Sequence, residues 1–318
     1  MLAIPNFSEG RDPHKISALA RALTSVDGVR LLDTHTDPDH NRTVFTLTAP
    51  VLADTAYAHP AHADPARAAI ADMRPSLADA LTAGAAAAIE QLDIASHEGS
   101  HPYVGMLDVA PIVYMGECER GSACAQALVL GDRLGTELQI PVFLYGVLTE
   151  WRVTRAAIRR GGPKNLQSRI DTGELTPDFG PRVLHPRAGA VLVSARPPLI
   201  AFNVDLAPPA TLETAQQIAA LIREGGPEGL PSVKAFGLTL PHREGIAQVS
   251  TNVEDYRQTN LAALVAAIAR HAPMVRAELV GVPPRAAFDG FPDDLPVANR
   301  RYLEDALQSA PENAADTD

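Results

Sequence analysis

Two histidines, His97 and His101, stand close together in one short polar segment of this chain, with a carboxylate between them. They follow an Ala-rich stretch, 78–95, whose residue types predict a helix. Gly99 and Pro102 then end that helix and force a tight loop. An imidazole held on such a loop can carry protons near neutral pH. The alternative is that both histidines are only solvated loop residues.

A second polar group follows a strand predicted at 29–34. Its members are Asp33, Asp37, Asp39, His40 and Arg42. Strand ends are a usual place for active-site groups in α/β proteins. A carboxylate here could orient His101, and Arg42 could hold a carboxylate ligand with two hydrogen bonds. The alternative is that Asp37 and Asp39, on either side of a proline, only form a turn.

Two further segments are candidates for binding. Asn6, Ser8 and Glu9 follow a short predicted strand at 2–6, where polar side chains either bind a ligand or cap the next helix. The stretch 152–169 contains no acidic residue and carries Arg152, Arg155, Arg159, Arg160, Lys164 and Arg169. Such a run either attracts an anionic substrate or forms a solvated helix face.

Composition limits the possible functions. A chain of 318 residues exceeds the usual size of one hydrophobic core, which predicts two domains or subdomains. The net charge of −11 argues against nucleic acid or an anionic membrane as partner. No apolar run approaches the roughly 20 residues that span a bilayer. Two cysteines and no secretory leader favour a reducing cytoplasm, and no phosphate-binding GxxxxGK[ST] loop occurs.

The order of the elements predicts a layered α/β protein of the α+β type. Strands are predicted at 2–6, 29–34, 44–48, 107–114 and 141–146, and helices at 12–26, 78–95 and 119–138. After a Gly- and Pro-rich linker or binding loop at 161–189 comes a second series, with strands at 190–194, 199–206, 233–240, 246–252 and 276–281 and helices at 210–223 and 256–271. We expect subdomains at 1–178 and 179–305 and a disordered acidic tail at 306–318. The segment 53–75, with His59, His62 and Asp64, reads as a surface excursion, and metal binding there is the weaker alternative.

Seven segments in order along the chain resemble the formiminotransferase family, the transferase part of formiminotransferase-cyclodeaminase. They are 4–10 (IPNFSEG), 31–33 (LLD), 37–44 (DPDHNRTV), 97–108, 177–181 (PDFGP), 201–204 (AFNV) and 247–252 (AQVSTN). The resemblance covers residues 3 to about 300. It implies two similar subdomains, each a mixed β-sheet with helices on its outer face, whose sheets face each other across a substrate cleft.

The resemblance also implies an activity. The expected reaction moves the formimidoyl group from N-formimidoyl-L-glutamate to tetrahydrofolate and releases L-glutamate, as in histidine degradation. It implies no metal, a homodimer and, because the chain ends where the cyclodeaminase would begin, a stand-alone transferase. Alternatives are a folate-binding protein without turnover, or an enzyme that handles 5-formyltetrahydrofolate. Because both substrates are anionic, the basic run at 152–169 is expected to gather them against the overall charge.

Roles carry over to matching residues only. His101 matches the family's proposed proton carrier, and His97 the second histidine of that motif, which we expect to orient groups or bind substrate. His35 stands where the animal enzymes have an aspartate proposed to act in catalysis, so we expect Asp37 or Asp39 to replace it. Binding roles are expected for Asn6, Ser8, Glu9, His40 and Arg42. The family's folate loop matches 180–189, which adds Gly180, Pro181, Arg182, His185, Pro186, Arg187 and Gly189. A side chain at Gly189 is expected to weaken folate binding while the fold is retained.

Overall fold

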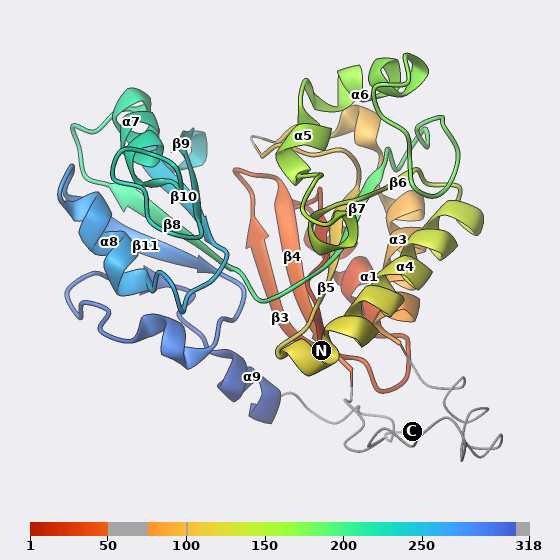
Figure 1. Ribbon diagram of the computed structural model, residues 1–318, viewed down its shortest axis with the longest axis horizontal. Coiled ribbons are helices and arrows are strands. Elements are labelled where there is room, and N and C mark those ends of the chain that lie inside the picture. The colour runs from red at the N-terminus through yellow and green to blue at the C-terminus, as the bar shows by residue number, and fades with distance from the viewer. Residues whose placement is uncertain (50–75, 100, 310–318) are drawn as a thin grey trace.

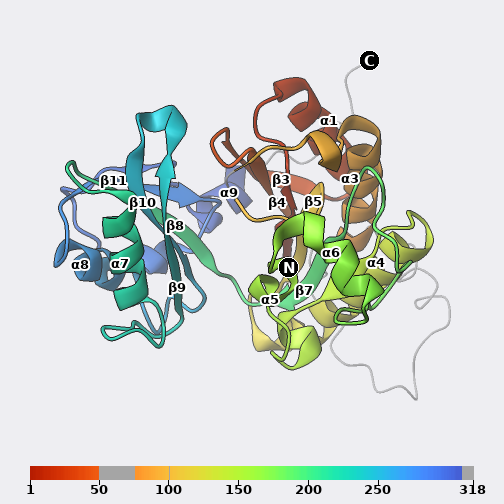
Figure 2. The same ribbon diagram turned by 90° about the horizontal axis from the view of Figure 1, so that it is seen from above.

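A computed structural model describes residues 1–49, 76–99 and 101–309. Two β-sheets face each other, and most helices cover their outer faces (Figure 1). Seen from above, the connection that follows β7 leads from one unit to the other (Figure 2). The expectation of two mixed sheets with helices is confirmed. The segment 53–75 lies outside the described residues.

The first sheet has seven strands. They are β1 (Leu2–Ala3), β2 (Asn6–Phe7), β3 (Arg30–Asp37), β4 (Arg42–Thr48), β5 (Leu107–Val113), β6 (Val142–Leu144) and β7 (Val191–Arg196). Both β1 and β2 lie between β4 and β5, so the predicted strand 2–6 is two short strands. Pro5 separates them. Strands β5 and β6 both run parallel to β7, whereas β3 and β4 form an antiparallel hairpin.

Helices α1 (Pro13–Leu23), α3 (Leu77–Gln91) and α4 (Arg120–Thr136) cover the outer face of this sheet (Figure 1). Asp12 caps α1 by accepting hydrogen bonds from the His14 and Lys15 amides, and Ser76 with Asp79 forms a capping box on α3. On β4, the side chains of Phe45 and Leu47 pack into this core. The side chains between them therefore face the opposite side of the sheet, since strand residues alternate.

Two short helices depart from the expected arrangement. Segment 161–189 is not all loop, because it contains α6 (Gly162–Asp171), which follows α5 (Arg155–Arg159). Ile158 of α5 and Leu166 of α6 pack with Val109 and Leu192, whose side chains leave the sheet on its inner side. These helices therefore cover part of the inner face, whereas helices were predicted on the outer faces only.

The second sheet has five strands in the order β12-β11-β8-β10-β9. They are β8 (Ile200–Leu206), β9 (Val233–Leu240), β10 (Ile246–Val253), β11 (Met274–Val280) and β12 (Val297–Ala298). Helices α7 (Leu212–Ile222) and α8 (Leu261–Ala269) cover its outer face (Figure 1). Phe202 and Val204 point into that core, whereas Asn203 and Asp205 alternate with them toward the first sheet.

Short 3-10 turns connect several of these elements. They are η2 (Ile94–Ser96), η3 (Glu117–Glu119), η4 (Gly146–Thr149), η5 (Pro241–Arg243) and η6 (Arg285–Phe288). The predicted helices at 78–95 and 256–271 are accordingly shorter than expected. In the second case the helix begins only after Asn260, whose side chain accepts a hydrogen bond from the Ala263 amide.

Two predicted boundaries are wrong. The first subdomain does not end at 178, because β7 pairs with β5 and β6 and so belongs to the first sheet. The chain passes to the second sheet between Arg196 and Ile200. The predicted disordered tail 306–318 overlaps α9 (Leu303–Ser309), whose Leu303 packs against Leu2 and Val113 of the first sheet. The rest of that tail lies outside the described residues.

Candidate active site

A cleft of about 830 Å³ lies between the inner faces of the two sheets. Strands of both sheets line it, with Asn6, Val44 and Ser194 on one side and Asn203, Phe236 and Ser250 on the other. Its charged lining residues are mostly cations: Arg42, Arg155, Arg159, Arg160, Arg196 and Lys234, against Asp37 and Glu254. An acidic protein therefore presents a basic cleft.

His101 lies in this cleft, and only its Nδ1 is hydrogen-bonded to a residue that the structure describes. Its Nδ1 is 2.7 Å from the carbonyl oxygen of Pro102, and because a carbonyl only accepts, Nδ1 must carry the proton. That assignment leaves Nε2 as a base. Burial lowers the pKa of His101 well below its usual value, and the nearby Arg42 and Arg159 lower it further. His101 is therefore neutral at pH 7 and ready to accept a proton.

Asp37 acts on His40 and not directly on His101. Its Oδ2 lies 3.3 Å from His40 Nδ1, and its Oδ1 accepts hydrogen bonds from the Asp39 and His40 amides at 2.8 and 2.9 Å. The His40 ring packs edge-on against His101, with ring centroids 5.7 Å apart. Burial lowers the pKa of His40, although Asp37 opposes that shift. Asp37 therefore both shapes the turn and fixes a second neutral imidazole beside the first.

Arg42 and Arg159 share one buried carboxylate, that of Asp108. Oδ2 of Asp108 accepts from Arg42 Nη1 at 2.7 Å and also from Arg159 Nη2, while Oδ1 accepts from the Val104 amide at 2.9 Å. Asn6 Oδ1 accepts from Arg42 Nε at 3.0 Å. Asp108 is fully buried, so its charge fixes two guanidinium groups beside His101.

The carboxylate with the largest influence on His35 comes from the second sheet, and Asp33 and Asp37 of its own strand act more weakly. Burial lowers the pKa of His35, and the Glu278 charge is the largest influence that opposes this shift. Glu278 is itself buried and pairs with Arg243 at 3.0 Å. His35 Nδ1 also lies 3.4 Å from Asn299 Nδ2, and Arg301 pairs with Asp33. His35, the residue that departs from the family pattern, therefore lies where the two subdomains contact each other.

The basic run at 152–169 divides into two sets. Arg155, Arg159 and Arg160 line the cleft, and Arg152, Lys164 and Arg169 do not. Arg169 instead donates to the carbonyl oxygens of Ala157, Ile158 and Arg160, which ties α6 to α5. The run is therefore neither wholly a substrate funnel nor wholly a solvated face.

Outside the loop 180–189, four predicted site residues do not line the cleft: His97, Asp39, Ser8 and Glu9. His97 packs edge-on against Tyr103 at 4.5 Å, and its Nδ1 lies 3.3 Å from Asn41 Nδ2. Glu9 accepts hydrogen bonds from the Arg11 and Asp12 amides, and Ser8 donates to the Gly105 carbonyl. These contacts shape the loops around the site.

The loop 180–189 also contributes no residue to the cleft lining. Arg187 donates to the Glu90 and Leu92 carbonyls at the end of α3, and Arg182 donates to Thr176. His185 Nδ1 accepts from the Arg187 and Ala188 amides. The loop lies beside the His101 segment through the pairing of Gly189 with Gly105, and its folate-binding role stays a prediction.

The backbone conformation at position 189 requires glycine. Its φ is +73°, and a Cβ there would lie 2.5 Å from the Val104 carbonyl oxygen. A side chain at Gly189 therefore strains the backbone, contrary to the prediction that the fold would be retained. Gly189→Ala should destabilise the protein by about 1–3 kcal/mol or more, measured by denaturant unfolding. The control is Gly173→Ala, with φ +75° and open space; equal losses in both variants would show that the Val104 contact is unimportant.

Four residues in or beside the cleft were not predicted from the sequence. Tyr145 and Arg196 line the cleft, whereas Asp108 and Glu278 act on residues that line it. Asp108 closes the matched segment 97–108, and that was the available signal for it. Tyr145, Arg196 and Glu278 lie at or near strand ends with no local pattern that sets them apart. Only the packing of the two sheets brings them near His101.

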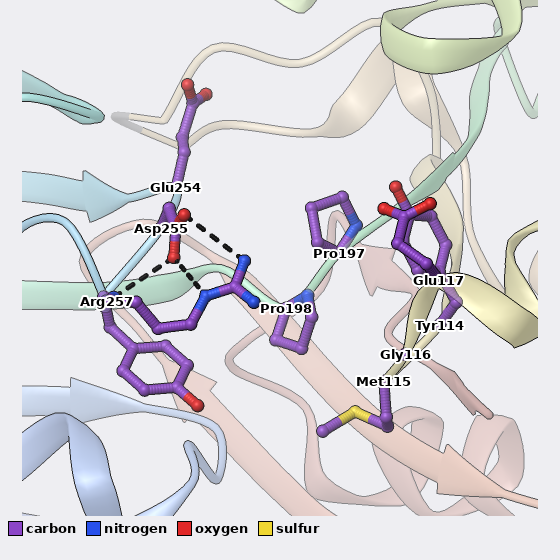
Figure 3. A pocket seen from close by; sticks show the side chains of 10 residues that line it. Tyr114, Met115, Gly116, Glu117, Pro197, Pro198, Glu254, Asp255 and Arg257 are labelled. Carbon is purple, nitrogen blue, oxygen red and sulfur yellow. Dashed lines mark hydrogen bonds and ion pairs between the residues drawn. The ribbon is translucent and has the colours of Figure 1, made fainter.

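A second, smaller pocket of about 90 Å³ lies where the chain passes between the sheets. Figure 3 shows Pro197 and Pro198 between Tyr114 on one side and Asp255 on the other. The Asp255 carboxylate already forms an ion pair with Arg257, whose Nε lies 2.8 Å from Asp255 Oδ1.

Within the described ranges, no group of three or more His, Cys, Asp or Glu side chains could hold a metal ion. None of the helices described is both long and apolar enough to cross a membrane.

The fold and cleft define a class: a two-sheet α/β protein whose subdomains enclose a basic cleft around neutral histidines. The chain belongs to the formiminotransferase family. The profile described as "Formiminotransferase domain, N-terminal subdomain" matches residues 1–196, and the one described as "Formiminotransferase domain" matches 201–288. These ranges agree with the change of sheet after β7.

Three relatives illustrate the similarity. The chain is 35% identical to a glutamate formimidoyltransferase of Thermoplasma acidophilum, over 89% of this chain and 88% of that protein. It is 34% identical to one of Streptococcus pyogenes serotype M1, over 81% and 78% respectively. It is 36% identical to the formimidoyltransferase-cyclodeaminase of Sus scrofa, over 89% of this chain. The chain spans about half the length of that pig protein.

Proposed function

We propose that this protein is a glutamate formimidoyltransferase, which moves the formimidoyl group of N-formimidoyl-L-glutamate to tetrahydrofolate and releases L-glutamate. The observation that carries the proposal is His101, a neutral base in a basic cleft of the family's fold. Relatives named for this activity support it.

The reaction requires one proton to change nitrogens. The amine at position five of tetrahydrofolate attacks the formimidoyl carbon, and a new carbon–nitrogen bond forms. His101 Nε2 accepts the proton of that amine and returns it to the glutamate nitrogen as the old carbon–nitrogen bond breaks. General acid–base help of this kind typically contributes about 100- to 10,000-fold in rate.

Charged neighbours suit the reacting group. The formimidoyl group is an amidine and carries positive charge when protonated, so it is favoured beside Asp37, which lines the cleft, and near Glu278. Arg42 and Arg159, both held by Asp108, keep His101 neutral and suit the carboxylates of the substrates.

Incubating the protein with tetrahydrofolate and N-formimidoyl-L-glutamate tests the proposal, with glutamate release as the readout. Release that depends on both substrates is the expected result. Tetrahydrofolate binding without release would favour the alternative of a folate-binding protein without turnover. Transfer from a formyl donor alone would favour the 5-formyltetrahydrofolate alternative.

We also propose a cytoplasmic homodimer. Cys118 and Cys124 are both free, as a reducing compartment would keep them. Helix α4 leaves Leu128 and Val129 exposed, at 42% and 53%, which offers apolar surface to a second copy. Sedimentation of the purified chain would test this, and a monomer at micromolar concentration would contradict the dimer.

A further inference from the structure

The cations of the cleft differ in whether a carboxylate compensates them. Arg42 and Arg159 share Asp108, and Arg160 pairs with Glu174. Lys234 lies 2.6 Å from Glu224 and 3.9 Å from Glu254. Two cations remain, Arg155 and Arg196. Neither makes an ion pair with any residue that the structure describes.

Arg196 is the more constrained of these two. It ends β7 on the cleft side, and its Nη1 donates to the Pro197 carbonyl at 3.0 Å. Its Nε is buried without a hydrogen-bond partner in the described part of the chain. Burial lowers the pKa of Arg196 to about 10. A guanidinium that has lost water and gained no counter-ion is costly, and an anion would offset that cost.

Tyr145 and Arg155 complete the surroundings of Arg196. The Tyr145 hydroxyl lies close to Arg196, yet it is buried and has no well-formed hydrogen bond among the described residues. The Arg155 guanidinium lies over the Tyr145 ring, 5.8 Å from its centroid. All three residues line the cleft. Two guanidinium groups that have no ion-pair partner among the described residues, and a buried hydroxyl beside them, are the donors that bind a carboxylate.

Other charges near this group do not satisfy it. Glu254 contributes a weak attraction to Arg196, but its nearest cation is Lys234. Asp108 is committed to Arg42 and Arg159. Arg155 and Arg159 are four residues apart on α5 and so share one helix face, which places Arg155 beside the arginine that influences His101.

We propose that Arg155, Arg196 and Tyr145 form a subsite for a glutamyl carboxylate. The assignment rests on the proposed function, because both of its substrates carry a glutamyl group: the donor itself and the tail of tetrahydrofolate. The shared chemistry is a carboxylate on a flexible chain, bound in the same cleft as His101. Which of the two substrates supplies it is decided by experiment.

The test measures binding of three probes to the full chain: N-acetyl-L-glutamate, tetrahydrofolate, and tetrahydropteroate, which lacks the glutamyl tail. Trp151, the chain's one tryptophan, lines the same cleft and reports binding by fluorescence, with calorimetry as a check. Variants are Arg155→Met and Tyr145→Phe. The matched control is Arg152→Met, which removes an exposed arginine that does not line the cleft.

Arg155→Met should lower the affinity for a glutamyl probe by about 10- to 100-fold, and Tyr145→Phe should lower it by about 3- to 10-fold. Arg155 has the larger effect because hydrogen bonds between charged groups are the stronger ones. A loss of affinity for N-acetyl-L-glutamate assigns the subsite to the formimidoyl donor. A loss of affinity for tetrahydrofolate but not for tetrahydropteroate assigns it to the glutamyl tail of the folate. If Arg155→Met matched Arg152→Met for all three probes, the proposal would be overturned. Wild-type protein that binds these probes through Arg155 but transfers nothing would overturn the proposed function and leave the subsite standing.

Discussion

Replacing His101 with alanine should lower kcat by about 100-fold or more, while the dissociation constant for tetrahydrofolate stays within several-fold. The reason is that the Nε2 lone pair acts only while protons move between two nitrogens. Single-turnover kinetics with direct folate titration would separate the two effects. His97→Ala is the control, because His97 does not line the cleft. Near-normal turnover without His101, or equal losses in both variants, would contradict the role.

The pH dependence of kcat provides a second measurement of the same residue. Burial and the two neighbouring arginines lower the pKa of His101, so the base stays neutral below pH 6.5, where an ordinary histidine is half protonated. The acidic limb of the profile should therefore lie below pH 6.5. Arg159→Met removes one positive charge and should move that limb upward. A limb that did not move would show that Arg159 does not tune the base.

Asp108→Asn should lower the free energy of unfolding by about 3–5 kcal/mol at pH 7, because it removes one member of a buried charge group. Two guanidinium groups would then share a buried site with no counter-charge. Urea unfolding at constant pH would measure this. The control is Glu137→Gln, which breaks an exposed pair with Arg133 and should cost less than about 1 kcal/mol.

The sign of the pH effect distinguishes this explanation from simple packing. Burial raises the pKa of Asp108, but Arg159 and Arg42 outweigh it, so the folded-state pKa lies below the usual value of 3.8. The ionised Asp108 carboxylate therefore contributes its full share of the free energy of unfolding above pH 3.8. That contribution is lost as the pH falls through the lowered pKa that Asp108 has in the folded protein. The difference between wild type and Asp108→Asn should shrink in that window. A constant difference would indicate lost packing instead of lost charge.

The sequence by itself determined the local elements and singled out His101, whose role as proton carrier stays a prediction. Alternation in 44–48 and the cap at Asp12 are properties of neighbouring residues, so they could be recognised without the fold. The motif ending at His101 and Pro102 likewise lies within one loop. The two-sheet arrangement followed from the resemblance. Its boundary was misplaced because β7 looks like the start of a second series until its parallel pairing with β5 is seen.

Only the tertiary structure decided which polar residues meet. Asp108 joins Arg42 and Arg159, which lie 66 and 51 residues away along the chain. Glu278 approaches His35 from the other sheet. The loop 180–189, prominent in sequence, is instead tied to the end of α3. Propensity and capping depend on neighbours a few residues apart, whereas ion pairs and burial depend on how whole sheets pack. The sequence therefore singled out His101, and the packing of the two sheets surrounds it with its charged neighbours and its cleft.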